Sequence, residues 1–193
     1  MPDDIRRANG SIVRDLLSVA TLLENPQLAG LYAYLYREGS ATVHEVMDAR
    51  NLSQETVHRL MARLEQLGVV EVITTDELPT YQATCIELSL SSGRDERTYT
   101  VTPALIDAVG RRRTDGDIDT YIDRRGVDGL ATALTYTVDR ERARVNHRLM
   151  ARDLDITPLE AEVILQALRP VVHEYFEIEV TDDDDVFEPG SNV

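Results

Sequence analysis

The sequence predicts a mainly α-helical protein with one small antiparallel β-hairpin. Two observations predict this fold class. Over most of the chain, apolar residues recur at steps of three and four, which is the period of an amphipathic helix. Between about residues 69 and 102, apolar and polar residues instead alternate as they do in strands, around a polar break at residues 76–79. We therefore expect helices before and after the hairpin.

Two helices are expected before residue 40. Apolar residues between Ile12 and Leu23 favour a first helix ending near Asn25, and Pro26 is well placed to open a second helix that runs to Gly39. The second helix would support the elements that follow. The first would be either a dimerisation arm or a packing helix.

A helix, a tight turn and a longer helix are predicted between Ser40 and Val72. Ser53 is a good N-cap for the longer helix, Glu55 suits the positive end of its dipole, and Gly68 ends it. The expected buried face of the pair consists of Val43, Val46, Met47, Leu52, Val57, Leu60, Met61, Leu64 and Leu67.

A hairpin should follow this pair of helices. Val69 to Thr74 forms the first expected strand and Tyr81 to Leu90 the second, and Thr98 to Thr102 can pair back on the second. The expected tip carries Asp76 and Glu77, whose negative charge argues against a deep contact with phosphate.

The outward face of the longer helix is polar. Side chains of this kind can donate hydrogen bonds to, or accept them from, base edges and phosphates in a major groove. The alternative is an ordinary solvated helix face, but the order helix, turn, helix, glycine and strand favours nucleic-acid binding. The candidate DNA-binding residues are Gln54, Thr56, His58, Arg59 and Arg63.

Residues 26–91 resemble the winged-helix domains of MarR-, ArsR- and TrmB-type transcriptional regulators. The motifs A-T-V-H-E-V-M and L-S-Q-E-T-V-H-R-L-M-A-R-L-E-Q-L-G-V-V carry the resemblance, which covers about a third of the chain. It implies a winged helix-turn-helix followed by a C-terminal helical region, with the recognition-helix positions on the five residues just named. The acidic hairpin tip departs from the family pattern. There is no metal-sensing cysteine motif, so we expect no metal site and no cofactor.

The composition is that of a protein from an extreme halophile. All 20 basic residues are Arg, and with 35 acidic residues they give a net charge of −15. Dense carboxylates keep a surface hydrated in molar salt, where their mutual repulsion is screened to about 3 Å. The resemblance is therefore to haloarchaeal regulators in particular.

The negative charge is uneven along the chain. Residues 1–70 hold 7 Arg and 9 acidic residues, a net charge of −2, whereas residues 71–193 hold 13 Arg and 26 acidic residues, a net charge of −13. The near-neutral part contains the helix-turn-helix. In concentrated salt, counterion release drives binding only weakly, so DNA binding should depend on base-edge contacts and vary little with salt.

Further helices are expected after the hairpin. Pro103 should open one that runs to about Arg113, and two shorter helices should follow between Ile118 and Val138. Another is expected from Asp139 to Asp153. The last would begin at the capping box Thr157-Pro158-Leu159-Glu160 and run to about Phe176.

Several arginines outside the recognition helix are candidates for DNA backbone contacts. For the triplet at residues 111–113 the alternative is interaction with the negative end of a helix dipole, and for the row below it is neutralisation by acids of neighbouring helices. Arg140, Arg144, Arg148 and Arg152 would form one row if residues 139–153 were a single helix. The candidate backbone contacts are Arg50, Arg111, Arg112, Arg113, Arg144 and Arg148.

Residues 149–157 can be aligned on residues 45–53. The alignment places Thr157 on Ser53 and Ile164 on Leu60, so a second helix-turn-helix is expected. Its outward residues include Glu160 and Glu162, which repel phosphate, so we interpret this copy as structural and protein-contacting.

The sequence predicts four parts: an N-terminal helix or arm (1–25), a winged-helix DNA-binding domain (26–102), a helical dimerisation or partner domain (103–179) and an acidic disordered tail (180–193). The residues 1–7 lack the apolar core of a signal peptide, and no stretch is apolar enough to span a bilayer, so we expect a cytoplasmic protein with no membrane contact. The single cysteine, Cys85, excludes an internal disulfide. The histidines are scattered and no phosphate-binding loop is present, so we expect no enzyme activity.

The predicted function is that of a homodimeric, sequence-specific transcriptional regulator that reads double-stranded DNA with residues 53–67. The alternative is a winged-helix protein-interaction adaptor in transcription or replication that does not itself read bases. An effector in the C-terminal helices rests on the family analogy alone.

Overall fold

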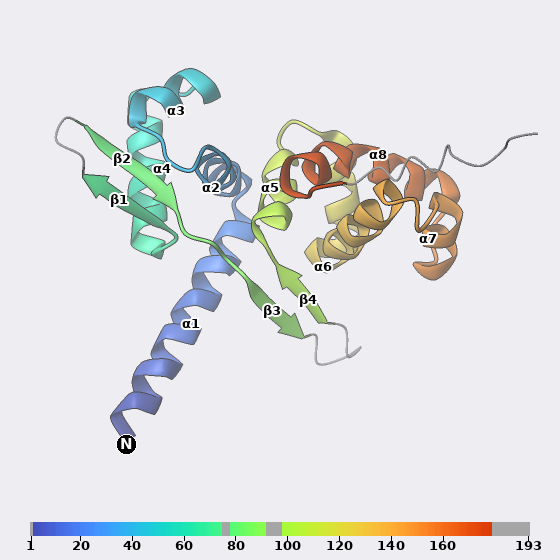
Figure 1. Ribbon diagram of the computed structural model, residues 1–193, viewed down its shortest axis with the longest axis horizontal. Coiled ribbons are helices and arrows are strands. Elements are labelled where there is room, and N and C mark those ends of the chain that lie inside the picture. The colour runs from blue at the N-terminus through green and yellow to red at the C-terminus, as the bar shows by residue number, and fades with distance from the viewer. Residues whose placement is uncertain (1, 75–77, 92–97, 179–193) are drawn as a thin grey trace, which may run out of the picture.

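The computed structural model describes residues 2–74, 78–91 and 98–178, with side chains from residue 13 onwards and without that of residue 74. These residues form eight helices and four strands, and the predicted fold class is confirmed (Figure 1). The elements are α1 (Pro2–Glu24), α2 (Pro26–Glu38), α3 (Val43–Arg50), α4 (Gln54–Leu67), β1 (Val70–Thr74), β2 (Pro79–Ala83), β3 (Leu88–Ser91), β4 (Thr98–Val101), α5 (Pro103–Arg111), α6 (Gly116–Glu141), α7 (His147–Asp153) and α8 (Pro158–Tyr175).

One continuous core runs through the molecule, from Val19 on α1 to Val172 on α8. At its centre α2 packs along α5, which joins the winged helix to the C-terminal helices α6, α7 and α8 (Figure 1). The N-terminal part of α1 extends away from this body (Figure 1). The division of the chain at residues 102 and 103 remains a prediction, and the packing of α2 on α5 joins the two parts.

The predicted caps set the helix boundaries. The side chain of Asn25 accepts hydrogen bonds from the backbone at the start of α2, and Thr42 and Glu45 form a reciprocal capping box on α3. Ser53 caps α4 and Thr157 caps α8, in each case by accepting from the backbone N–H three residues on. These short-range bonds explain why helix starts could be read from the sequence.

The second expected strand, Tyr81 to Leu90, is wrong as a single strand. It is split into β2, which pairs antiparallel with β1, and β3, which pairs antiparallel with β4 in a separate hairpin. Between them, the buried hydroxyl of Tyr32 donates to the carbonyl of Thr84 at 2.7 Å. The hydrogen-bonding capacity of that carbonyl is thereby satisfied without a partner strand. The chain can therefore leave the β1–β2 hairpin, which is the wing, and start a second hairpin.

The expected helix from Asp139 to Asp153 is also wrong. α6 ends at Glu141, Ala143 has a left-handed backbone (φ 58°), and α7 starts at His147. The side chain of Asn146 accepts hydrogen bonds from the N–H groups of Arg148 and Leu149, and this local capping competes with continuation of the helix. Of the four arginines of the expected basic row, Arg140 therefore lies on α6, Arg144 lies in the loop between the helices, and the other two lie on α7.

The two expected short helices between Ile118 and Val138 are present as the two halves of α6. They meet at Gly126, whose φ of 72° and ψ of 178° are not helical. The expected acidic tail, residues 180–193, and the hairpin-tip residues Asp76 and Glu77 lie outside the described residues.

The expected second helix-turn-helix is present in α7 and α8. Each residue of the first unit corresponds to the residue 104 positions later in the second. Asn51 and Asp155 both have a positive φ in the turn (49° and 51°), and Gly39 and Ala143 both have a positive φ before the first helix of each unit (77° and 58°). The repeat therefore starts earlier than the aligned segment and includes the end of the preceding helix.

Candidate nucleic-acid interface

Helix α4 is held by its apolar face. Val57, Leu60, Met61 and Leu64 are buried against the neighbouring elements, and Leu52 N–H donates to the carbonyl of Met47 at 3.2 Å across the turn. A bridge between Ala41 and Tyr81 joins the loop before α3 to the wing. These contacts fix α4 relative to α3 and the wing, as a winged helix requires.

The opposite face of α4 is open. Gln54, His58, Arg59 and Arg63 are exposed, and Thr56 is half-buried. At 100° per residue, these side chains span the arc of the helix that the four buried residues leave free. The structure therefore brings the five predicted side chains together on one surface.

The five side chains differ in how firmly they are held. Thr56 shares a 2.8 Å hydrogen bond with the hydroxyl of Ser53, so its position is fixed by the cap. Gln54 and His58 approach each other at 3.5 Å, and Arg63 approaches Gln66 at the same distance. Arg59 makes no hydrogen bond or ion pair with any described residue. It is the freest donor on this face.

Three exposed residues in the middle of the same face were not predicted as site residues. The helical period places Glu55, Ala62 and Gln66 between the Gln54–His58 edge and the Arg59–Arg63 edge. Glu55 was interpreted only through the helix dipole, yet a carboxylate can accept a hydrogen bond from the amino group of cytosine. Projection of the helix from the sequence alone could have identified all three.

The candidate backbone arginines differ in whether acidic side chains neutralise them. Arg111 is paired with Asp107 and Glu174, and Arg112 is paired with Asp119 and Asp123. Arg144 is exposed and lies 3.7 Å from Asp139. The remaining three, Arg50, Arg113 and Arg148, have no side-chain ion pair with the described residues.

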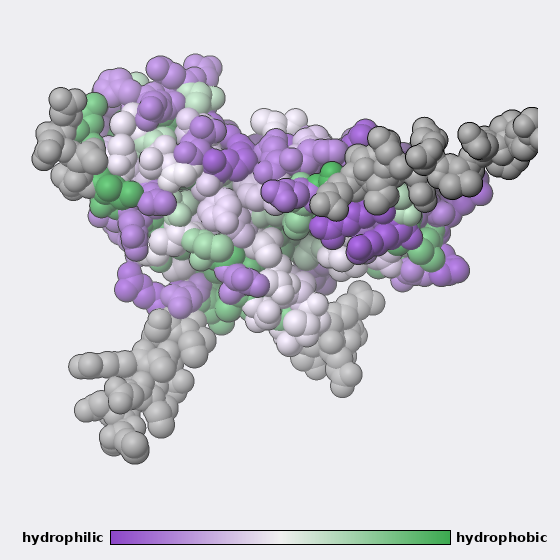
Figure 2. Space-filling view, viewed as in Figure 1, coloured by the Kyte–Doolittle hydropathy of each residue, from purple (hydrophilic) through white to green (hydrophobic). Residues whose placement is uncertain are grey.

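The described part of the wing, the β1–β2 hairpin, exposes three large apolar side chains. Val72 and Ile73 on β1 and Leu78 beside β2 have exposed fractions of 39%, 39% and 58%. Figure 2 shows apolar residues on this hairpin at the left of the molecule, while hydrophilic residues gather over α3 above it. This surface offers van der Waals contacts rather than cationic ones.

The described residues contain no group of three His, Cys, Asp or Glu side chains that could hold a metal ion. None of the helices in the described part of the chain combines the length and hydrophobicity that crossing a membrane needs.

Comparisons with known protein families match two parts of the chain. Residues 112–177 match the model of a family of unknown function (DUF7437), which spans α6, α7 and α8. Residues 30–71 match the model described as winged helix-turn-helix DNA-binding, which covers α2, α3, α4 and the start of the wing. No curated protein and no solved structure matches the chain. Residues 30–71 are therefore a winged helix-turn-helix DNA-binding domain.

Proposed function

We propose that the protein is a sequence-specific transcriptional regulator that reads the major groove with α4. The observation that carries this proposal is the open polar face of α4, where Gln54, His58, Arg59 and Arg63 are exposed together on the second helix of a helix-turn-helix. Amide and guanidinium groups on such a helix match the hydrogen-bonding edges of adenine and guanine. We infer no enzymatic activity for the chain.

The second helix-turn-helix provides an internal comparison. Positions of α8 equivalent to Gln54, His58, Arg59 and Arg63 are Pro158, Glu162, Val163 and Ala167. Glu162 is held by Arg140 at 2.9 Å. The α8 copy thus has the backbone of the motif without its cationic donors, which supports assigning base reading to α4.

The resemblance to MarR-, ArsR- and TrmB-type regulators and the lysine-free, acidic composition support a regulator that works in high salt. Under those conditions the phosphate term is weak, and base-edge contacts should dominate the affinity.

We propose further that the protein acts as a homodimer through α1. Val13, Leu16 and Leu17 have exposed fractions of 56%, 42% and 62%, and Ala20 is exposed one turn later. This spacing forms one apolar stripe on a helix that extends from the body (Figure 1). A second copy of α1 would cover the stripe, and a dimer would place two α4 helices on paired half-sites.

Binding to the DNA upstream of the protein's own coding region in molar KCl tests the regulator proposal. Arg59→Ala should weaken specific binding about tenfold or more, since one good base contact is worth roughly 1–3 kcal/mol. Arg124→Ala removes an exposed arginine from α6 and is the matched control. Absence of a specific shift, or equal binding by Arg59→Ala and the control, would favour the adaptor alternative.

Light scattering at high salt tests the dimer. Leu17→Glu should give a monomer, whereas Leu159→Glu should not, although Leu159 on α8 is even more exposed at 74%. If Leu159→Glu gave a monomer and Leu17→Glu did not, the dimer interface would lie on the C-terminal helices instead of α1.

A further inference from the structure

A cavity of about 610 Å³ lies between the winged helix and the C-terminal helices. Side chains from α2, the end of α3, α5 and α8 line it. Its volume is in the range of small-molecule binding sites. It lies apart from the polar face of α4.

Two glycines line the cavity where α2 and α5 cross. A Cβ atom added to Gly110 on α5 would lie 2.7 Å from the backbone N and Cα of Gly30 on α2. The two helices therefore touch backbone to backbone, and neither contributes a side chain to the space beside the contact. Both glycines line the cavity at this close crossing.

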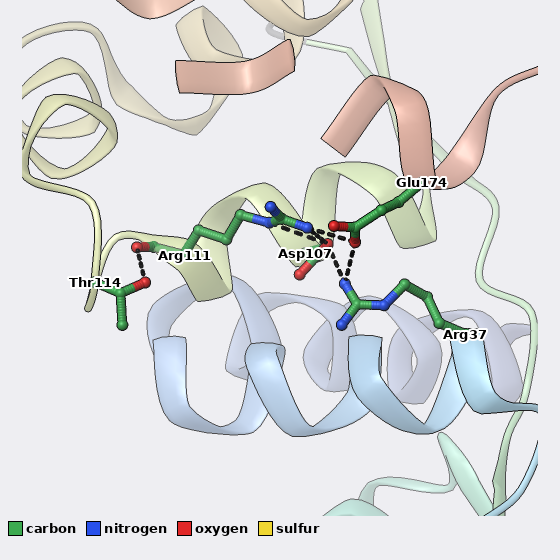
Figure 3. A network of polar contacts seen from close by, with 5 residues as sticks. All are labelled: Arg37, Asp107, Arg111, Thr114 and Glu174. Atoms are coloured by element: carbon green, nitrogen blue, oxygen red, sulfur yellow. Dashed lines mark hydrogen bonds and ion pairs between the residues drawn. The ribbon is translucent and has the colours of Figure 1, made fainter. Parts of the chain in front are cut away.

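Two of the arginines on the cavity are neutralised. Arg37 lies 2.7 Å from Asp107 and 2.6 Å from Glu174, and Arg111 lies 2.8 Å and 2.5 Å from the same two carboxylates. Figure 3 shows the four side chains converging from α2, α5 and α8. Desolvation acts to lower the pKa of Arg111, but hydrogen bonds to Asp107 and Glu174 outweigh it and raise that pKa.

Two further arginines on the cavity are unpaired. Arg50 and Arg113 have no ion-pair partner among the described residues. The guanidinium of Arg50 lies against Gly30, since a Cβ added to Gly30 would be 2.7 Å from its Nη2. Desolvation lowers the pKa of Arg50, and the charges of Arg37 and Arg113 lower it further, although Asp107 opposes them. Arginine stays protonated in proteins even when its pKa is lowered. The positive charge of Arg50 therefore lies near two other positive charges and has no counterion of its own.

The remaining acid on the cavity does not supply that counterion. Asp115 also lines the space, but its carboxylate accepts hydrogen bonds from the N–H groups of Asp117 and Ile118 at the start of α6. Four arginines thus surround the cavity with three carboxylates, in a chain whose net charge is −15. The residues that line the cavity therefore carry a net charge of +1, from four arginines and three carboxylates.

We propose that this cavity binds a small organic anion, whose phosphate or carboxylate group is held by Arg50 and Arg113. Guanidinium groups bind such oxyanions through paired, charge-assisted hydrogen bonds. The binding does not require that α4 reads DNA. Since Arg50 ends α3 and Arg113 follows α5, the ligand connects the helix-turn-helix to the C-terminal helices, which is the position of an effector.

Calorimetric titration with inorganic phosphate, and separately with citrate, at a fixed KCl concentration tests the site. The wild-type protein should bind at least one of the two anions with a stoichiometry of one per chain, and the stronger binder identifies the preferred group. Arg50→Gln and Arg113→Gln should each weaken binding about tenfold or more, because each removes a charge-assisted hydrogen bond. Arg124→Gln, with the same change in net charge on α6, should bind like the wild type.

Two further measurements complete the test. Gly30→Ala places a methyl group where the Arg50 guanidinium lies and should weaken anion binding, while circular dichroism verifies that each variant is folded. Failure of the wild type to bind either anion, or equal binding by all variants, would overturn the proposal. So would an Arg50→Gln variant that binds both anions normally but binds DNA more weakly with a reduced salt dependence, because Arg50 would then be a backbone contact.

Discussion

The guanidinium of Arg37 on α2 and the carboxylate of Asp107 on α5 lie 2.7 Å apart at the junction of the winged helix and the C-terminal helices. The Asp107 side chain is only 6% exposed and also accepts from Arg111, so it pairs with two cations. The α2–α5 contact is therefore polar at this end and apolar along the rest of its length.

Replacing Asp107 by Asn should destabilise the protein by about 2–3 kcal/mol. The change leaves Arg37 and Arg111 with only Glu174 as partner, and breaking a buried ion pair from one side is costly. Both guanidinium groups are partly exposed, so the loss of stability should be smaller than for a fully buried ion pair. Denaturant unfolding measures the effect. Glu174→Gln is the control, since that side chain is 38% exposed and its loss should cost less. Equal effects of the two changes would contradict the central role of Asp107.

The contribution of Glu162 to the stability of the fold should depend on pH. Hydrogen bonds from Arg140 and Gln166 lower the pKa of Glu162 to about 2 from an ordinary value of 4.5. Because the folded pKa is depressed, its stabilisation is complete above pH 4.5 and is lost as the pH falls towards 2. The side chain is 33% exposed, and solvent weakens its interactions. We therefore expect the ionised Glu162 to stabilise the folded protein by only about 1 kcal/mol at neutral pH.

Thermal unfolding of Glu162→Gln at several pH values measures this contribution. The variant should be less stable than the wild type at pH 7, and the difference should shrink below pH 4. A difference that stays constant between pH 7 and pH 3 would show that Glu162 acts through packing and not through its charge.

Local chemistry explains the parts of the fold that could be predicted. The caps at Thr42, Ser53 and Thr157 bond within three residues, so their effect is visible in sequence order. The cap at Asn146 has the same local character and could have been recognised, which would have prevented the prediction of one helix from Asp139 to Asp153. The open face of α4 could likewise be predicted, since it is what the apolar positions leave free.

Contacts between distant segments explain what could not be predicted. The break after Ala83 depends on a hydroxyl from Tyr32, and the second ion pair of Arg111 is with Glu174, 63 residues further along the chain. The cavity beside Arg50 is lined by two glycines that meet across α2 and α5. No periodicity or spacing encodes such pairings, so the arginines on the cavity could not be sorted into paired and unpaired ones.

The hydrogen bond from Tyr32 to Thr84 should stabilise the chain where it leaves the wing. Tyr32→Phe removes the donor from a buried site and should cost about 1 kcal/mol, since the carbonyl of Thr84 loses its partner at 2.7 Å. Tyr34→Phe, on the more exposed side of α2, should cost less. Hydrogen exchange of residues 79–91 would show where the loss acts. Unchanged protection there would contradict a role in separating β2 from β3.

Replacing Ala143 by glycine should increase the stability of the protein. Its left-handed backbone (φ 58°) costs an L-residue roughly 1–2 kcal/mol, whereas the equivalent position in the first helix-turn-helix holds Gly39 (φ 77°). Glycine loses more chain entropy on folding, so the net gain from Ala143→Gly should be about 0.5–1 kcal/mol. The converse change, Gly39→Ala, should be destabilising, although a Cβ there meets no atom within 4 Å.

Denaturant unfolding of both variants measures the backbone effect without a change in packing. Ala133→Gly, in the buried interior of α6, is the control and should lose about 1 kcal/mol, because glycine is unfavourable within a helix. If Ala143→Gly were as destabilising as the control, residues 142–146 would behave as helix, and the correspondence between the two helix-turn-helix units would not extend before α7. A gain at Ala143 together with a loss at Gly39 would establish that both units turn in the same way.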